Sequence, residues 1–210
     1  GCQVLERARP RSRVDTLSTN HGGIAAVGVP GIRLSLLDLG VRPETFELLC
    51  VRVVSGSSSC VVATVYRPGS AAITSAFFTE LSDMLDRLAT FTDPVFLVGD
   101  TNVHLERVTD SNACQLIEVL EIHGLVNRVS GPTHDRGGTL DIVASRDDLE
   151  PPRVDSLSVG TSDHRMLCWS APLGRPCPVY TTTTSRPWKR LDATALSTSL
   201  QQSPLCQPAT

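Results

Sequence analysis

Apolar and polar positions along the chain predict an order of strands and helices. Short β-branched segments fill the first part, and two of them flank the sequence SGSS in the manner of a hairpin. Two later stretches repeat apolar residues every three or four positions, as helices that bury one face do. The continuous apolar run PVFLVG is typical of a strand covered on both faces. We expect strands at 22–29, 33–41, 45–54, 59–66, 94–99, 125–129, 137–145 and 164–171, and helices at 74–91 and 111–124.

This order of strands, helix, strand, helix and strands predicts a mixed α/β fold in which helices cover sheets. We assign the folded domain to residues 22–171, after an extended, Arg-rich lead-in at residues 1–21. Residues 172–210 are rich in Pro, Thr and Ser and resemble a linker, within which 191–200 could form a short helix.

Composition narrows the class of protein. The chain has 210 residues, 40% of them hydrophobic, and no apolar stretch approaches the length of a membrane span. Its net charge of -3 does not fit a broad basic surface for passive nucleic-acid binding. The seven cysteines are widely spaced and form no CxxC pair, which favours reduced thiols and an intracellular location over disulfides or a zinc knuckle.

Candidate chemistry begins where the apolar run ends, in the sequence VFLVGDTNVH. Side chains alternate along an extended backbone, so Asp100 and Asn102 point the same way, and His104 joins them if the strand continues. Gly99 allows the backbone to bend or to approach a ligand closely. A strand that simply ends in an Asp-containing turn explains the same residues, and this alternative stays open.

Four further residues carry reactive groups. Asp163 and His164 are adjacent and could contact a cation and a phosphate, or could lie in a solvated turn. Asp141 lies between apolar residues and needs a partner if it is buried, for which a His is suited, but it could also face water on an edge strand. Tyr66 ends a strand, at a sheet rim or in the core. The other loop histidines, among them His134, have no comparable context.

The order of these segments resembles the endonuclease/exonuclease/phosphatase superfamily. VYRP is followed by GDTNVH, then by PTH with GGTLDIV, and then by SDH before an apolar strand. The closer similarity is to the apurinic-type endonuclease domain of non-LTR, LINE-like retrotransposons, and it extends over nearly the whole chain. The resemblance implies a four-layer sandwich of two mixed β-sheets flanked by helices, and a phosphodiesterase that uses Mg²⁺ or Mn²⁺.

The resemblance also implies a role for each matching residue. Asp100 corresponds to the acid that activates water, Asn102 to the amide that positions phosphate and nucleophile, and Tyr66 to a phenol near the phosphate. His164 corresponds to the imidazole that contacts the scissile phosphate, oriented by Asp141. These residues, with Asp163 as a carboxylate on the metal side, form the expected site.

Two departures from the family pattern affect this expectation. The family's first strands carry an Asn and a metal-binding Glu that lie before residue 1, and neither Glu6 nor Asn20 has the context to replace them. We therefore expect an N-terminally truncated domain that lacks the first strands and binds metal weakly. In addition, Thr101 stands where the elements usually have Phe, which removes an apolar contact behind the site.

Three hypotheses for function follow. The first is a truncated retrotransposon endonuclease that nicks target DNA, with the element RNA and a covalently linked reverse transcriptase as partners, in the nucleus during integration and in the cytoplasm otherwise. The second is a catalytically inactive remnant without the metal-binding Glu. The third is a phosphatase of the same superfamily acting on a small substrate, against which the linker towards a reverse transcriptase argues.

Overall fold

The computed structural model describes residues 1–8, 23–173 and 192–203, in two compact units. The second unit, Val179–Thr210, contains α3 (Ala193–Gln201), which confirms the short helix expected within residues 172–210. Its first turn is capped by the side chain of Asp192, which accepts a hydrogen bond from the backbone N–H of Ala195. None of the helices in the described ranges is long and apolar enough to cross a membrane.

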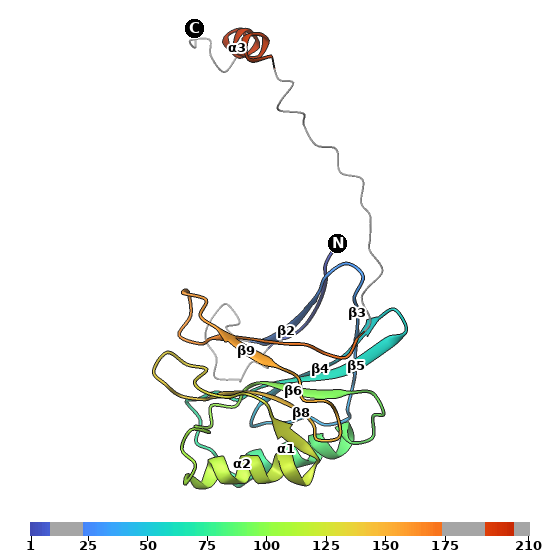
Figure 1. Ribbon diagram of the computed structural model, residues 1–210, viewed down its shortest axis with the longest axis vertical. Coiled ribbons are helices and arrows are strands. Elements are labelled where there is room, and N and C mark those ends of the chain that lie inside the picture. Colours follow the sequence, from blue (N-terminus) through green and yellow to red (C-terminus); the bar gives the residue numbers. More distant parts are fainter. Residues whose placement is uncertain (9–22, 174–191, 204–210) are drawn as a thin grey trace. The chain divides into compact units, whose positions relative to one another are not determined.

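The first unit, Gly1–Pro178, is built around a six-stranded mixed sheet (Figure 1). Strands β5 and β6 are parallel, and every other neighbouring pair is antiparallel. A parallel pair needs a crossover connection, and α1 supplies it between these two strands. In spatial order the strands are β3 (Arg33–Leu36), β4 (Glu47–Ser55), β5 (Ser58–Tyr66), β6 (Val95–Asp100), β8 (Asp141–Arg146) and β7 (Leu125–Asn127).

Two helices, α1 (Ser75–Leu88) and α2 (Ser111–Ile122), cover one face of this sheet. The apolar side of α1 includes Phe77, Leu81 and Leu85, all fully buried, as its spacing predicts. These side chains pack with those of β4, β5, β6 and β8 that point to the same side, and the result is the main hydrophobic core.

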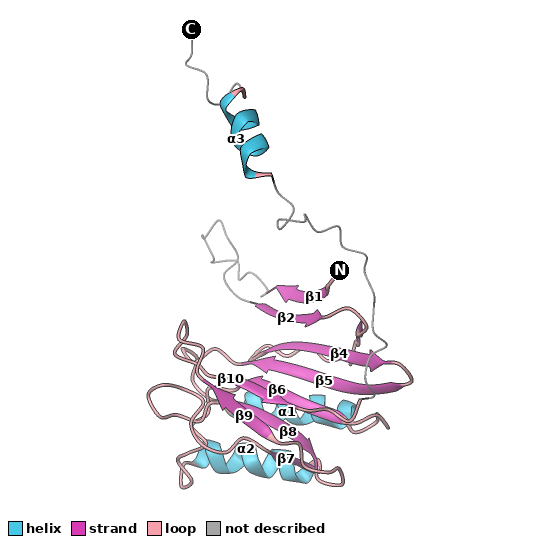
Figure 2. Cartoon of the chain, turned by 45° about the horizontal axis from the view of Figure 1, so that its top comes forward, coloured by secondary structure: helices cyan, strands magenta, loops and turns pink. Residues whose placement is uncertain are grey.

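The other face of the sheet carries two antiparallel strand pairs, β1 (Gln3–Ala8) with β2 (Gly23–Gly28), and β9 (Val154–Leu157) with β10 (Met166–Trp169) (Figure 2). Each pair packs on its own smaller apolar cluster. The structure therefore confirms the mixed α/β sandwich of sheets and helices. In the described part of the first unit, both helices lie on one side and the second β layer consists of two separate pairs.

The observed strands differ from the expected ones in several places. The lead-in assigned to residues 1–21 contains β1, whose charged residues concealed its pairing with β2, while 9–21 lie outside the described residues. Strand β9 was not predicted from the sequence, because it is short and half-exposed. The strand expected at 33–41 ends at Leu36, and the strand expected at 137–145 begins only at Asp141.

Strand β6 is buried on both faces, as its continuous apolar sequence predicts. Val95 and Leu97 face the helices, whereas Phe96 and Val98 face β9 and β10. Gly99 then has φ 129°, and a Cβ atom placed there would lie 1.9 Å from the carbonyl oxygen of Val65. Only glycine fits between these parallel strands, immediately before Asp100.

Replacing Gly99 with Ala should unfold the domain or lower its free energy of unfolding by about 3 kcal/mol or more, because the added carbon meets backbone rather than a mobile side chain. Gly40→Ala is a matched control: its φ is 72° and a Cβ there has no neighbour within 4 Å. Backbone strain alone should cost the control about 1–2 kcal/mol. Denaturant unfolding compares the two, and equal losses would contradict the close strand approach.

Candidate active site

Three predicted site residues lie in one row across the six-stranded sheet. Tyr66 is directly opposite Asp100 in the parallel pair β5–β6, and Asp100 is directly opposite Asp141 in the antiparallel pair β6–β8. Neighbouring strands are about 4.8 Å apart, so the three side chains lie close together at one end of the sheet. All three occupy the alternation positions that face away from the helices.

His164 completes this group from the loop before β10. Its Nδ1 is 3.0 Å from Oδ2 of Asp141, and its Nε2 is 3.9 Å from Oδ2 of Asp100. Because a carboxylate only accepts hydrogen bonds, Nδ1 carries the proton and donates to Asp141. Nε2 is then the nitrogen that faces Asp100 and any bound group.

Burial and neighbouring charge act in opposite directions on His164. Burial would lower the pKa of His164, but the hydrogen bond to Asp141 and the charges of Asp141, Asp100 and Asp163 raise it above its usual value. The imidazolium form is therefore favoured more than in a free histidine.

Asp100 and Asn102 are joined by two hydrogen bonds. The backbone N–H of Asn102 donates to Oδ1 of Asp100 at 2.8 Å, and its Nδ2 donates to Oδ2 at 2.9 Å. Asn102 has φ 49°, a left-handed conformation that Asn tolerates better than most residues. Burial raises the pKa of the Asp100 carboxyl group, and the nearby Asp141 raises it further.

Arg67 holds the loop that carries Asn102, and sequence analysis did not single it out. Its side chain is buried, with 3% of the residue exposed, and burial lowers the pKa of its guanidinium. Nε donates to the carbonyl of Thr101 at 2.7 Å and Nη2 to that of Asn102 at 2.8 Å. Nη1 donates to the carbonyls of Ala71 and Pro68. In the sequence, Arg67 is simply an Arg directly after a predicted strand, and this position does not predict a buried side chain.

Two small residues fit the same loop. A Cβ at Gly69 would lie 2.7 Å from Oδ1 of Asn102, so the loop after VYRP passes directly over that amide. Thr101 is buried, and its hydroxyl and backbone N–H both donate to the carbonyl of Leu140. Thr101 thus ties the loop to the start of β8 by hydrogen bonds, where an apolar contact was expected in the family.

The PTH segment holds the SDH loop in place, and sequence analysis used it only as a motif. Thr133 is buried, and its hydroxyl accepts hydrogen bonds from the backbone N–H groups of Leu140 and Asp141. Its carbonyl accepts from the N–H of Arg165, and the backbones of His134 and His164 form an isolated β-bridge. His164 therefore reaches Asp141 because this segment fixes the loop that carries it.

In the described part of the chain, two groups of side chains could hold a metal ion. Asp100, Asp141 and His164 form one, and His134, Asp163 and His164 form the other, with ligand atoms within 4.8 Å of one another in each. Asp163, the expected metal carboxylate, thus belongs to a different group from Asp100. Its side chain is 68% exposed and can receive a hydrated cation. Oxygen donors of this kind fit Mg²⁺, which binds proteins through one or two carboxylates and several waters.

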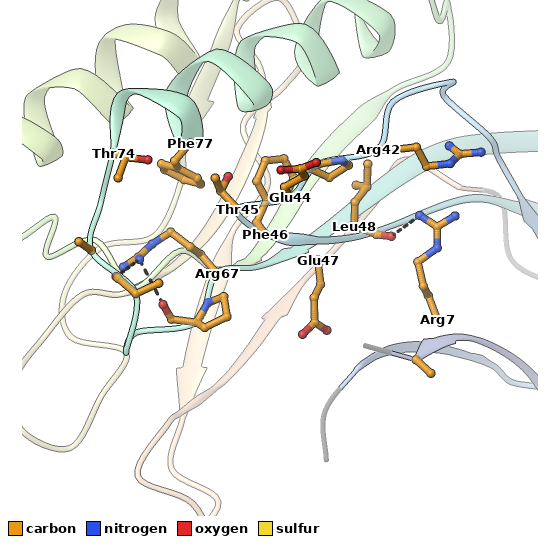
Figure 3. A pocket seen from close by; sticks show the side chains of 15 residues that line it. Arg7, Arg42, Glu44, Thr45, Phe46, Glu47, Leu48, Arg67, Thr74 and Phe77 are labelled. Atoms are coloured by element: carbon orange, nitrogen blue, oxygen red, sulfur yellow. Dashed lines mark hydrogen bonds between the residues drawn. The ribbon is translucent and has the colours of Figure 1, made fainter. Parts of the chain in front are cut away.

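A pocket adjoins this site but does not contain it (Figure 3). It has a volume of about 870 Å³. Arg67 and Phe77 lie at one end and Arg7 and Arg42 at the other, and Arg7 donates to the carbonyl of Leu48. Glu47, which is directly opposite Tyr66, also lines it. The pocket is thus a neighbouring space reached from the row of site residues.

Several solved structures have a fold similar to that of the chain. The endonuclease domain of TRAS1, a telomere-specific non-LTR retrotransposon, is 16% identical, with 83% of this chain and 81% of that chain covered and a TM-score of 0.60. The human Nocturnin catalytic domain with bound sulfate is 17% identical (81% and 73% covered, TM-score 0.52). The 3′ phosphatase NExo from Neisseria, bound to product DNA hairpin, is also 17% identical (81% and 79%, TM-score 0.51).

Sequence comparison defines the family more narrowly. Residues 60–168 match the endonuclease-reverse transcriptase family, and they include the strands and loops that carry Tyr66, Asp100, Asp141 and His164. The chain belongs to this family, as its ordered motifs predicted. No curated protein sequence matches the chain significantly.

Replacing Asp141 with Asn should make stability less dependent on pH between 6 and 9. The folded pKa of His164 lies above its usual 6.5, so its charged contact with Asp141 stabilises the fold fully below pH 6.5 and is lost as pH rises through the folded pKa. The amide still accepts the Nδ1 hydrogen bond but carries no charge. Denaturation midpoints should therefore show a larger loss at pH 6 than at pH 9. An equal loss at both pH values would contradict this contact, and the exposed Asp155→Asn is the control.

Arg67→Met should lower the free energy of unfolding by about 2–4 kcal/mol, because it leaves buried carbonyl groups without donors. Arg33→Met, on the exposed side of β3, is the matched control and should change it by about 0.5 kcal/mol or less. Urea unfolding measures both. Similar values for the two variants would mean that Arg67 does not support the Asn102 loop.

Proposed function

We propose that the chain carries a retrotransposon-type DNA endonuclease domain, which hydrolyses a phosphodiester bond with a divalent cation and so nicks target DNA. The observation that carries this proposal is the meeting of Asp100, paired with Asn102, and His164, held by Asp141, at one end of the sheet. The similar fold of the TRAS1 endonuclease domain and membership of the endonuclease-reverse transcriptase family support the choice of substrate.

The side chains divide the work of hydrolysis between them. Asp100 accepts the proton of an attacking water, a task favoured by a raised carboxyl pKa. Asn102 keeps the carboxylate fixed through its two hydrogen bonds. In its imidazolium form, which its raised pKa favours, His164 donates from Nε2 to a phosphate oxygen, while Asp141 accepts the hydrogen bond from Nδ1 and fixes the ring. Tyr66, next in the row, contacts the same phosphate through its phenol.

A divalent cation, Mg²⁺ or Mn²⁺, would neutralise charge on the phosphoryl and leaving oxygens when bound. Asp163 is the carboxylate that would hold it, because Asp100 and Asp141 are already engaged with Asn102 and His164. A single carboxylate binds such a cation weakly. We propose that the protein acts in the nucleus with its element RNA and a linked reverse transcriptase.

A plasmid-nicking assay tests this proposal. Nicking should require Mg²⁺ or Mn²⁺ and stop with a chelator, and Asp100→Ala and His164→Ala should each lower it at least about 100-fold, since each removes a group that acts in the transition state. Asp155→Ala, an exposed acid on β9, is the control and should leave nicking unchanged.

Three results would overturn the proposal in different ways. Nicking that persists in both variants would exclude Asp100 and His164 as catalytic residues. No nicking with either cation would identify a catalytically inactive remnant. Hydrolysis of a small phosphomonoester without DNA nicking would favour the phosphatase hypothesis.

A further inference from the structure

His134 lies beside the catalytic group and has no role in the chemistry above. Its side chain is 13% exposed, and its ring meets that of His164 edge to face, with centroids 4.9 Å apart and an interplanar angle of 79°. Nε2 of His134 is 3.2 Å from Oδ2 of Asp163. One residue thus contacts both members of the Asp163–His164 pair.

The hydrogen bonds of His134 define where its ring proton is. The backbone N–H of Arg136 donates to Nδ1 of His134 at 3.1 Å, so this nitrogen must offer a lone pair. A neutral imidazole has one N–H, which therefore lies on Nε2. Nε2 then donates to the carboxylate of Asp163.

This tautomer decides between two roles for His134. The set His134, Asp163 and His164 could suit a transition metal such as Zn²⁺, which binds imidazole and carboxylate. Metal binding through Nε2 of His134 would need that nitrogen without its proton, and the proton cannot move to Nδ1 while Arg136 donates there. The ring chemistry therefore favours a hydrogen-bond donor over a metal ligand.

We propose that His134 is a positioning residue, which holds Asp163 through Nε2–H and confines the ring of His164 by its edge contact. The backbone β-bridge between His134 and His164 fixes the two rings relative to each other. The catalytic consequence rests on the proposed function, since it is the work of Asp163 and His164 that depends on this placement. The tautomer of His134 does not rest on it.

The first arm of the test records NMR spectra of the ¹⁵N-labelled wild-type chain at pH 8.5 and does not depend on enzymatic activity. Long-range ¹H–¹⁵N spectra should give His134 the shifts of an Nε2–H tautomer and His164 those of an Nδ1–H tautomer. Addition of Zn²⁺ should leave the tautomer of His134 unchanged. An Nδ1–H tautomer at His134, or its Nε2 bound to Zn²⁺, would overturn the proposal.

The second arm compares three variants. His134→Phe keeps an aromatic edge without a donor, His134→Gln keeps a donor that can reach Asp163, and His123→Gln changes another largely buried His that contacts a carboxylate, Asp86, far from the site. Loss of such a supporting group typically costs about 10- to 100-fold in metal affinity or activity. For His134→Phe we expect a decrease of that size in kcat or in the affinity for Mg²⁺. The KM for DNA should not change. His134→Gln should recover most of it, and His123→Gln should behave as wild type.

The two arms separate failure of the inference from failure of the proposed function. If wild type does not nick DNA, the proposed function fails, and the spectra alone test the role of His134. His134→Phe should then broaden or weaken the Nδ1–H signal of His164, and His134→Gln should preserve it. An unchanged His164 signal in His134→Phe overturns the positioning role. Equal nicking by wild type and His134→Phe does so as well.

Discussion

The pairing of β6 with its two neighbours is the constraint on which the site depends. Parallel pairing with β5 and antiparallel pairing with β8 bring Tyr66, Asp100 and Asp141 into one row, although they are distant in sequence. The register is held by apolar side chains on both faces of β6, since a shift of one residue would turn every one of them to the wrong face. The chemistry at the end of the sheet is thus fixed by packing in its middle.

The polar loops around this row are held by buried hydrogen bonds. Arg67 donates hydrogen bonds to backbone carbonyls of the loop that carries Asn102. Thr133 accepts hydrogen bonds from the backbone at the start of β8. Irregular backbone has no ladder partners of its own, so such bonds replace the secondary structure that these segments lack. They also explain how Asn102 can keep a left-handed conformation without a regular element around it.

The strands that pack on both faces and the two helices could be predicted from sequence, because their apolar spacing reports burial directly. The short strands β1 and β9 could not, since half-exposed segments with many charged residues carry little periodicity. Among the site residues, the motif order singled out Asp100, Asn102, Asp141 and His164, and the structure brings these four together. Arg67 and His134 escaped because their roles depend on contacts between loops far apart in the chain, which no local pattern records.

The raised carboxyl pKa of Asp100 has a consequence for the thermodynamics of binding. Two carboxylates in register, partly withdrawn from water, make the ligand-free fold less stable than it would be without that charge. A cation held beside this row by Asp163 would relieve part of this penalty in the folded chain alone, so its affinity is linked to the free energy of unfolding. The melting temperature, measured as a function of ion concentration, therefore reports ion binding. It can rank the ions by affinity without a substrate.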